Sequence, residues 1–133
     1  MATTLTDEVR TMLTEGTNFA ALSTVRADGA SQTSLVWIDA EGDNIVFNTA
    51  EGRLKTKHLR RDPRVSLCVF DPANPYRQAL IRGRVVDITP EGADDHIDSL
   101  AKRYLGQDKY PFRAPGEERL IVRIAPERVG MMG

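Results

Sequence analysis

Six cationic side chains lie close together near the middle of the sequence, in a protein whose net charge is −1. They are Arg53, Lys55, Lys57, Arg60, Arg61 and Arg64. The first of them fall where a helix is expected to begin, and there unpaired backbone N–H groups already make the helix end partly positive. Cations are unfavourable at such a position unless an anion is bound. Free N–H groups together with converging cations are typical of a phosphate-binding site.

Arg53, Lys55 and Lys57 are the strongest candidates for this anion site, because they lie in the first turns of the expected helix. Thr49, at the end of the preceding strand, can add a hydroxyl donor to the same phosphate. The two arginines that follow suit the C-terminal end of a helix, and Arg64 can pair with nearby acids, so these three need no ligand. A solvated basic face on a surface helix remains the alternative for the whole segment.

A strand and a short helix must position these cations. The alternation of Ile45 and Phe47 in residues 44–49 predicts a strand, and residues 52–61 contain good helix formers. Pro63 ends the helix, because the residue before a proline disfavours helical geometry. The candidate site therefore lies where a strand passes into a helix.

The rest of the chain is predicted to consist mostly of strands. A helix precedes them at residues 6–16, and another lies at residues 89–106 with Thr89 as its cap. The first three strands, joined by tight turns, are expected to form an antiparallel meander. The strand at 65–70 is expected to be buried on both faces, and Gly83 is expected to bend the strand that follows. The six strands are two in residues 18–39, around a turn at 27–29, then 44–49, 65–70, 77–88 and 119–129.

This order of elements predicts an α+β fold in a single domain, residues 1–133. Six antiparallel strands with few helices indicate a closed or half-closed barrel, which removes the exposed edges that an open sheet would carry. Strands and helices do not alternate, so a parallel nucleotide-binding sheet is not expected.

The composition is that of an ordinary globular protein, with 41% apolar and 28% charged residues. No long apolar run predicts a transmembrane helix, and the N-terminus lacks the features of a secretion signal. Cys68 is the only cysteine, which fits a reducing cytoplasm, and we expect it to be a small buried side chain. His58 and His96 lie far apart and away from this cysteine, so no metal site is expected.

Three segments, in this order, resemble a known family: SQTSLVW at 31–37, FNTAEGRLKTKHLRRDPRVSL at 47–67 and NPYRQALIRGRV at 74–85. They are similar to the split-barrel flavin-binding superfamily that includes pyridoxamine 5′-phosphate oxidase. Within it, they are most similar to small actinobacterial proteins that use the deazaflavin coenzyme F420. The resemblance extends from Phe19 to Val129. It implies a six-stranded split barrel with short flanking helices, a homodimer, and two cofactor sites at the subunit interface.

The resemblance also implies a cofactor site drawn from three parts of the chain. Arg53, Lys55 and Lys57 would hold the cofactor phosphate, and Asn48 and Thr49 would reach the phosphate and the ring. The remaining members are Gln32 and Ser34 beside the ring, Pro75 and Tyr76 in a loop lining the site, and Gln78 facing the ring from the second subunit.

The residues outside the cationic segment also have purely structural interpretations. Gln32 and Ser34 could be outward-facing side chains of an alternating strand. Tyr76 could cover the end of the barrel, and Gln78 could be a strand residue without a ligand. The aromatic residues expected in the core or at the dimer interface are Phe19, Trp37 and Phe47.

The function implied is that of an F420-dependent oxidoreductase, which transfers a hydride from the reduced deazaflavin to a conjugated acceptor such as an enone, a quinone or a nitroaromatic. The cofactor carries the hydride, so no catalytic side chain is assigned. The sequence of residues 48–63 is more similar to the deazaflavin-binding members, which favours F420 over FMN. Pyridoxamine phosphate oxidases have a C-terminal extension beyond the point where this sequence ends, so vitamin B6 oxidation is not expected. Further cations that could meet the acidic tail of F420 are Arg60, Arg61, Lys102 and Arg103.

Three alternatives remain open: an FMN-binding protein similar to pyridoxamine 5′-phosphate oxidase, a non-catalytic carrier of F420 or FMN, and a nucleic-acid-binding barrel. The net charge of −1 and the lack of aromatic residues among the cations argue against nucleic acid. We therefore expect a cytoplasmic homodimer that acts on a small molecule, with neither a nucleic-acid nor a membrane partner.

Overall fold

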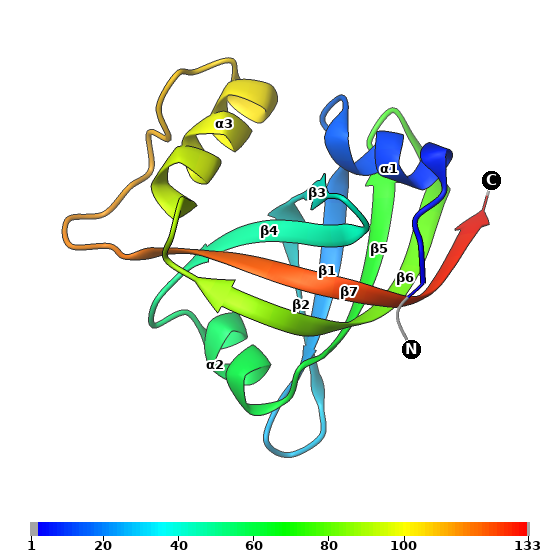
Figure 1. The fold of residues 1–133 in the computed structure, drawn as a ribbon, viewed down its shortest axis with the longest axis horizontal. Coiled ribbons are helices and arrows are strands. Elements are labelled where there is room, and N and C mark those ends of the chain that lie inside the picture. The colour runs from blue at the N-terminus through cyan, green and yellow to red at the C-terminus, as the bar shows by residue number, and fades with distance from the viewer. Residues whose placement is uncertain (1–2, 133) are drawn as a thin grey trace.

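A computed structural model describes residues 3–132 of the chain. Seven antiparallel strands form one strongly curved sheet in the order β2-β1-β5-β6-β7-β4-β3, with three helices at its margins (Figure 1). The fold is therefore an α+β split barrel, as the sequence predicts. The elements are α1 (Asp7–Thr14), β1 (Phe19–Val25), β2 (Ser31–Trp37), β3 (Asp39–Glu41), β4 (Asn44–Ala50), α2 (Leu54–Arg61), β5 (Arg64–Asp71), β6 (Asn74–Thr89), α3 (Ala93–Leu105) and β7 (Arg119–Met132).

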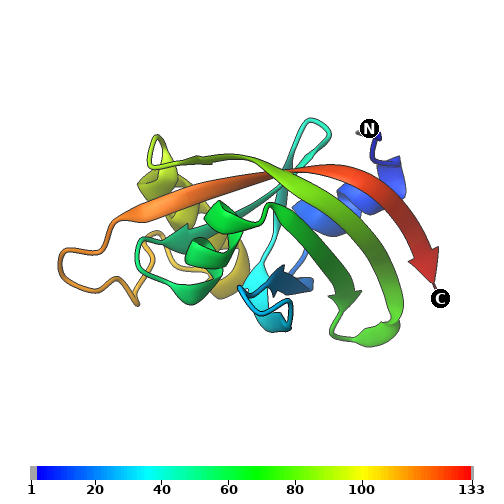
Figure 2. The same ribbon diagram turned by 90° about the horizontal axis from the view of Figure 1, so that it is seen from below.

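The curvature of the sheet comes from its two longest strands, β6 and β7 (Figure 2). Their register shifts between Arg82 and Gly83, and a Cβ atom at Gly83 would lie only 2.6 Å from the carbonyl oxygen of Ala125. A side chain at this position would force the two backbones apart. The bend predicted at Gly83 is therefore confirmed, and it exists because only glycine allows this close approach.

The predicted meander is only half right. β1 and β2 form the expected hairpin, but β4 pairs with β7 on one side and with the short strand β3 on the other. The chain departs from the predicted meander at Ile38. The N–H of Ile38 donates to the Tyr104 hydroxyl at 3.1 Å, and its carbonyl accepts from Arg103. These contacts with α3 end β2 and redirect the chain, so β4 is built into the opposite end of the sheet.

The prediction that β5 is buried on both faces is wrong. Val65, Leu67 and Val69 lie in the core, whereas Ser66 is exposed and Cys68 is half-buried. The strand thus has one core face and one outer face that the described residues leave uncovered. Partial burial raises the pKa of the Cys68 thiol.

The helices begin and end largely where the sequence indicates. Thr6 caps α1 through a hydrogen bond from the N–H of Val9. α3 begins later than predicted, because the Thr89 hydroxyl accepts from the N–H of Glu91 in a turn and the helix starts after Gly92. None of the helices within residues 3–132 is long and apolar enough to cross a membrane.

α2 follows β4 after a short turn and lies below β6, at the lower left of Figure 1. Arg53 is its N-cap residue, but its side chain accepts no capping hydrogen bond. The helix ends at Arg61, and Asp62 takes an extended conformation before Pro63, as predicted. The underside of α2 is anchored by Thr56 and Leu59, which are buried.

Candidate functional site

A cavity of about 320 Å³ lies beside the free edge of β2, between the start of α2, α3 and the loop that precedes β7. Its wall is aromatic and aliphatic, and its polar edge carries three cations and one amide. The apolar lining consists of Phe19, Leu35, Val36, Trp37, Ile97, Leu100, Tyr110 and Phe112. The polar edge consists of Asn48, Arg53, Lys55 and Arg119.

Arg53 and Lys55 carry the positive charge at the polar edge of the cavity that no described carboxylate neutralises. Within residues 3–132, neither forms an ion pair with a carboxylate. Burial, together with the charges of Arg53 and Arg119, lowers the pKa of Lys55. The first N–H groups of α2 point out of the same helix end and have no side-chain cap. This end of the cavity is therefore suited to a phosphate or another compact anion.

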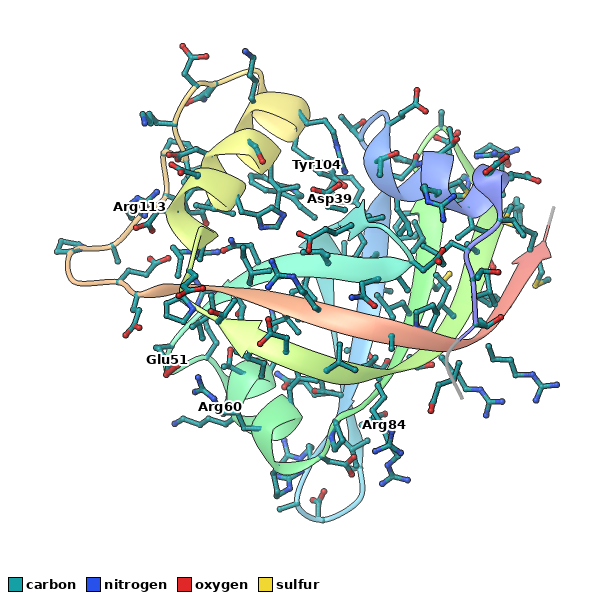
Figure 3. All side chains as sticks on the ribbon, in the orientation of Figure 1. Asp39, Glu51, Arg60, Arg84, Tyr104 and Arg113 are labelled. Atoms are coloured by element: carbon teal, nitrogen blue, oxygen red, sulfur yellow. The ribbon has the colours of Figure 1, made fainter. Side chains whose placement is uncertain are left out.

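The later cations of the segment behave as predicted, because each has a partner. Arg60 forms a two-pronged ion pair with Glu51, with one N–O distance of 2.9 Å (Figure 3). Arg61 donates to a backbone carbonyl of the β1–β2 hairpin, and Arg64 pairs with Asp62 at 2.8 Å. These three arginines are thus held by the fold itself.

Two predicted site residues from the same segment are placed outside the cavity. Lys57 is exposed on α2 and does not line it. Thr49 is only 2% exposed, and its hydroxyl lies 3.3 Å from that of Thr56, which in turn donates to the carbonyl of Ala50. In this arrangement Thr49 fastens α2 to β4, and its role as a phosphate donor stays a prediction.

Gln32 and Ser34 are half-buried. They pair with the buried residues Thr24 and Leu22 of β1, so their side chains lie on the barrel side of β2. They are therefore not outward-facing strand residues. Neither lines the cavity, although their neighbour Leu35 does. The side-chain oxygen of Gln32 is buried without a hydrogen-bond partner among the described residues.

Pro75, Tyr76 and Gln78 lie on β6, which the order of the sheet separates from β2 by β1 and β5. Tyr76 is 81% exposed, so it does not cover the barrel within this chain. Gln78 is half-buried opposite Phe70. Within one chain these three residues do not reach the cavity that Asn48, Arg53 and Lys55 share.

Trp37 forms part of the cavity wall, whereas the sequence placed it in the core or at an interface. Its ring stacks on that of Tyr104 at 5.1 Å, and Tyr110 meets it edge-on at 5.9 Å. Phe19, also expected in the core, lines the same cavity, whereas Phe47 is fully buried as expected. Aromatic residues far apart in the sequence thus form one surface suited to a planar ring.

Arg119 is a site residue that the sequence analysis missed. Its side chain is 4% exposed and ion-paired with Glu117, and its Nε donates to Asn48 Oδ1 at 2.9 Å. The guanidinium also lies 5.1 Å from the centre of the Tyr110 ring. One signal was available: an arginine followed by the apolar run LIV opens the strand directly after an irregular loop.

Asn48, a predicted site residue, contacts a histidine, which in turn faces an aspartate. Its Nδ2 atom donates to the carbonyl of Ala93 at 2.9 Å and lies 3.1 Å from His96 Nδ1. His96 Nε2 lies 3.4 Å from Asp39 Oδ2. Burial opposes ionisation of Asp39, but hydrogen bonds from His96 and from the Ala40 N–H outweigh it, so the pKa of Asp39 is lowered.

Comparison with known proteins places this architecture in a family. Residues 5–133 match the family model of pyridoxamine 5′-phosphate oxidase. The solved structure of a protein named F420 Reductase is 30% identical, with a TM-score of 0.78, and the alignment covers 94% of this chain and 98% of that one.

More distant structures share the fold. General Stress Protein 26 of Bacillus anthracis is 18% identical, with a TM-score of 0.65 over 94% of this chain and 92% of that one. A pyridoxamine 5′-phosphate oxidase-related, FMN-binding protein of Nostoc punctiforme is 13% identical, with a TM-score of 0.59 over 84% and 72% of the two chains. The family model spans nearly the whole sequence, and the chain belongs to the pyridoxamine 5′-phosphate oxidase family.

Proposed function

We propose that the protein is an oxidoreductase that binds the deazaflavin F420 and uses its reduced form to reduce a conjugated small molecule. The observation that carries this proposal is the cavity in which unpaired Arg53 and Lys55 lie beside an aromatic wall. A phosphate next to a planar ring is the chemistry that this pairing of charge and aromatic surface fits. The 30% identity to a protein named F420 Reductase supports the choice of cofactor.

The residues of this chain would bind and orient the cofactor. Arg53, Lys55 and the free N–H groups of α2 would hold its phosphate, and Arg119 and Asn48 would meet polar atoms nearer the ring. Trp37 and its aromatic neighbours would exclude water from one side of the ring. When bound, the reduced cofactor supplies the hydride, so the protein contributes position and electrostatics and needs no nucleophile.

FMN is the second candidate, because it also joins a phosphate to a planar ring system. A structural relative from Nostoc punctiforme is FMN-binding, although its 13% identity supports the fold alone. The cationic edge would serve either cofactor, and the identity to an F420 reductase is what favours F420.

We also propose that the working form is a homodimer whose second subunit supplies Pro75, Tyr76 and Gln78. These residues resemble site residues of the family, yet in one chain two strands separate them from the edge strand beside the cavity. A second copy, packed against the outer face of the sheet, could bring the start of its own β6 to this cavity.

Titration of the purified protein with F420 and with FMN, each followed by fluorescence, tests the cofactor assignment. We expect F420 fluorescence to be quenched at lower concentration than FMN fluorescence. Tighter binding of FMN would replace the first candidate by the second, and binding of neither would refute both. Turnover of reduced F420 with a panel of enones, quinones and nitroaromatics then separates a reductase from a carrier, which would bind the cofactor without oxidising it.

A further inference from the structure

A chain of four polar side chains leads from Arg119 at the cavity to Asp39 on β3. Arg119 Nε donates to Asn48 Oδ1 at 2.9 Å, and Asn48 Nδ2 lies 3.1 Å from His96 Nδ1. His96 Nε2 lies 3.4 Å from Asp39 Oδ2. The chain joins β7, β4, α3 and β3, four elements that are distant in the sequence. Figure 3 shows Asp39 between α3 and the sheet.

We propose that His96 and Asp39 are positioning residues, which lock the Asn48 carboxamide and thereby the Arg119 guanidinium in the orientation that the cofactor site requires. This inference rests on the proposed function, since it concerns the same cavity. It adds a specific consequence: removal of the acceptor atom of His96 breaks the chain, so binding of the cofactor phosphate and ring weakens.

The orientation of Asn48 follows from its neighbours. Its Oδ1 faces the Arg119 Nε–H, and its Nδ2 faces the carbonyl oxygen of Ala93 at 2.9 Å. A flipped amide would set N–H against N–H at Arg119 and oxygen against oxygen at Ala93, so only one orientation satisfies both contacts. Asn48 Nδ2 therefore presents a hydrogen to His96 Nδ1, which must be the unprotonated ring nitrogen.

The tautomer of His96 follows in turn. If Nδ1 accepts from Asn48, the ring proton of the neutral histidine lies on Nε2, which faces Asp39 Oδ2. Asp39 is fitted to accept it, because the Ala40 N–H and the nearby Arg103, 3.6 Å away, favour the ionised carboxylate. The Arg119–Asn48 and Asn48–His96 links thus each have one donor and one acceptor. His96 Nε2 is buried and faces the Asp39 carboxylate at 3.4 Å without forming a hydrogen bond of regular geometry in this arrangement.

The experiment compares cofactor binding by the wild type, His96→Asn and His96→Leu. An asparagine oxygen can take the place of Nδ1 and accept from Asn48, whereas leucine cannot. We expect His96→Asn to bind like the wild type, and His96→Leu to lose affinity by about two- to tenfold, the worth of one hydrogen bond. Equal losses of affinity in His96→Asn and His96→Leu would overturn the proposal.

A second measurement works on the free protein and so separates this inference from the cofactor assignment. The ¹⁵N–¹H NMR spectrum of the His96 ring reports which nitrogen carries the proton. We expect the Nε2–H form, because Nδ1 accepts from Asn48. An Nδ1–H ring would refute the chain even if F420 binds, and an Nε2–H ring in a protein that binds neither cofactor would refute only the proposed function.

Discussion

Arg53 and Lys55 differ from the other cations of their segment in what surrounds them. Arg60 and Arg64 each have a carboxylate partner, whereas Arg53 and Lys55 face a cavity without one among the described residues. Charge density in the sequence indicated the segment, but only the fold separates the cations that are neutralised internally from those left to meet a ligand.

Replacement of Lys55 by alanine should weaken cofactor binding by roughly ten- to a hundredfold, because a charge-assisted hydrogen bond to phosphate contributes about 1.5–3 kcal/mol. Fluorescence titration measures the affinity, and circular dichroism checks that the fold is intact. Arg64→Ala is the matched control, since Arg64 is paired with Asp62, lies outside the cavity and should leave the affinity unchanged. An equal loss of cofactor affinity in the two variants would mean that the overall positive charge of the segment attracts the cofactor and that Lys55 makes no phosphate contact.

A rise in pH should weaken the interaction of Lys55 with the cofactor phosphate, and this loss should begin at a lower pH than for an ordinary lysine. The pKa of Lys55 is lowered below 10.5 by burial and by two neighbouring cations, so its charge is present at neutral pH and is lost as pH rises through the lowered value. Cofactor affinity should fall over that interval. Lys55→Arg, which keeps its charge, should show no such fall, and a parallel decline in both proteins would exclude Lys55 as its cause.

Arg119, His96 and Asp39 could not be assigned from the sequence, and the reason is physical. Arg119 and Asn48, which share a hydrogen bond, are 71 residues apart, and their contact depends on β4 pairing with β7. Nothing local in the sequence encodes that pairing. The phosphate-binding end was predictable because its cations and its helix start are consecutive in the chain.

At the scale of elements, local signals predicted local structure. The cap at Thr6, the hairpin between β1 and β2 and the stop before Pro63 each depend on a few adjacent residues, and each was confirmed. The meander failed because it assumed that the strand at 44–49 pairs with β2. Ile38 is instead held by Tyr104, 66 residues further along the chain.

The close approach of β6 and β7 at Gly83 leads to a prediction about the stability of the fold. Gly83→Ala should lower the free energy of unfolding by about 1–3 kcal/mol, because the new methyl group would meet the Ala125 carbonyl at 2.6 Å and the Ile124 side chain at 2.8 Å. Chemical denaturation measures the loss. Gly130→Ala is the control on the neighbouring strand, since a methyl group there meets nothing within 4 Å and should cost little. Comparable stability of the two variants would show that β6 bends without a steric need for glycine.

At the scale of the whole molecule, the outer face of the sheet is a surface that the described residues of one chain leave uncovered. A groove of about 580 Å³ crosses β1, β5, β6 and β7, with exposed Leu80 on its wall. Arg82 and Arg128 lie directly opposite each other on this face, and neither forms an ion pair within residues 3–132. Like charges at such positions repel, so a surface that supplies anions and covers Leu80 would stabilise this face.

A second copy is the occupant that the proposed site calls for, since it would also deliver Tyr76 and Gln78. Light scattering coupled to size-exclusion chromatography should therefore give the mass of a dimer for the wild type. Leu80→Glu should shift the mass towards the monomer and weaken cofactor binding in parallel, because both depend on the same packing. Val86→Glu, on the same strand and 57% exposed but outside the groove, should change neither quantity. If Leu80→Glu became monomeric while keeping full cofactor affinity, each chain would hold its cofactor alone, and the contribution of the partner's β6 would have to be abandoned.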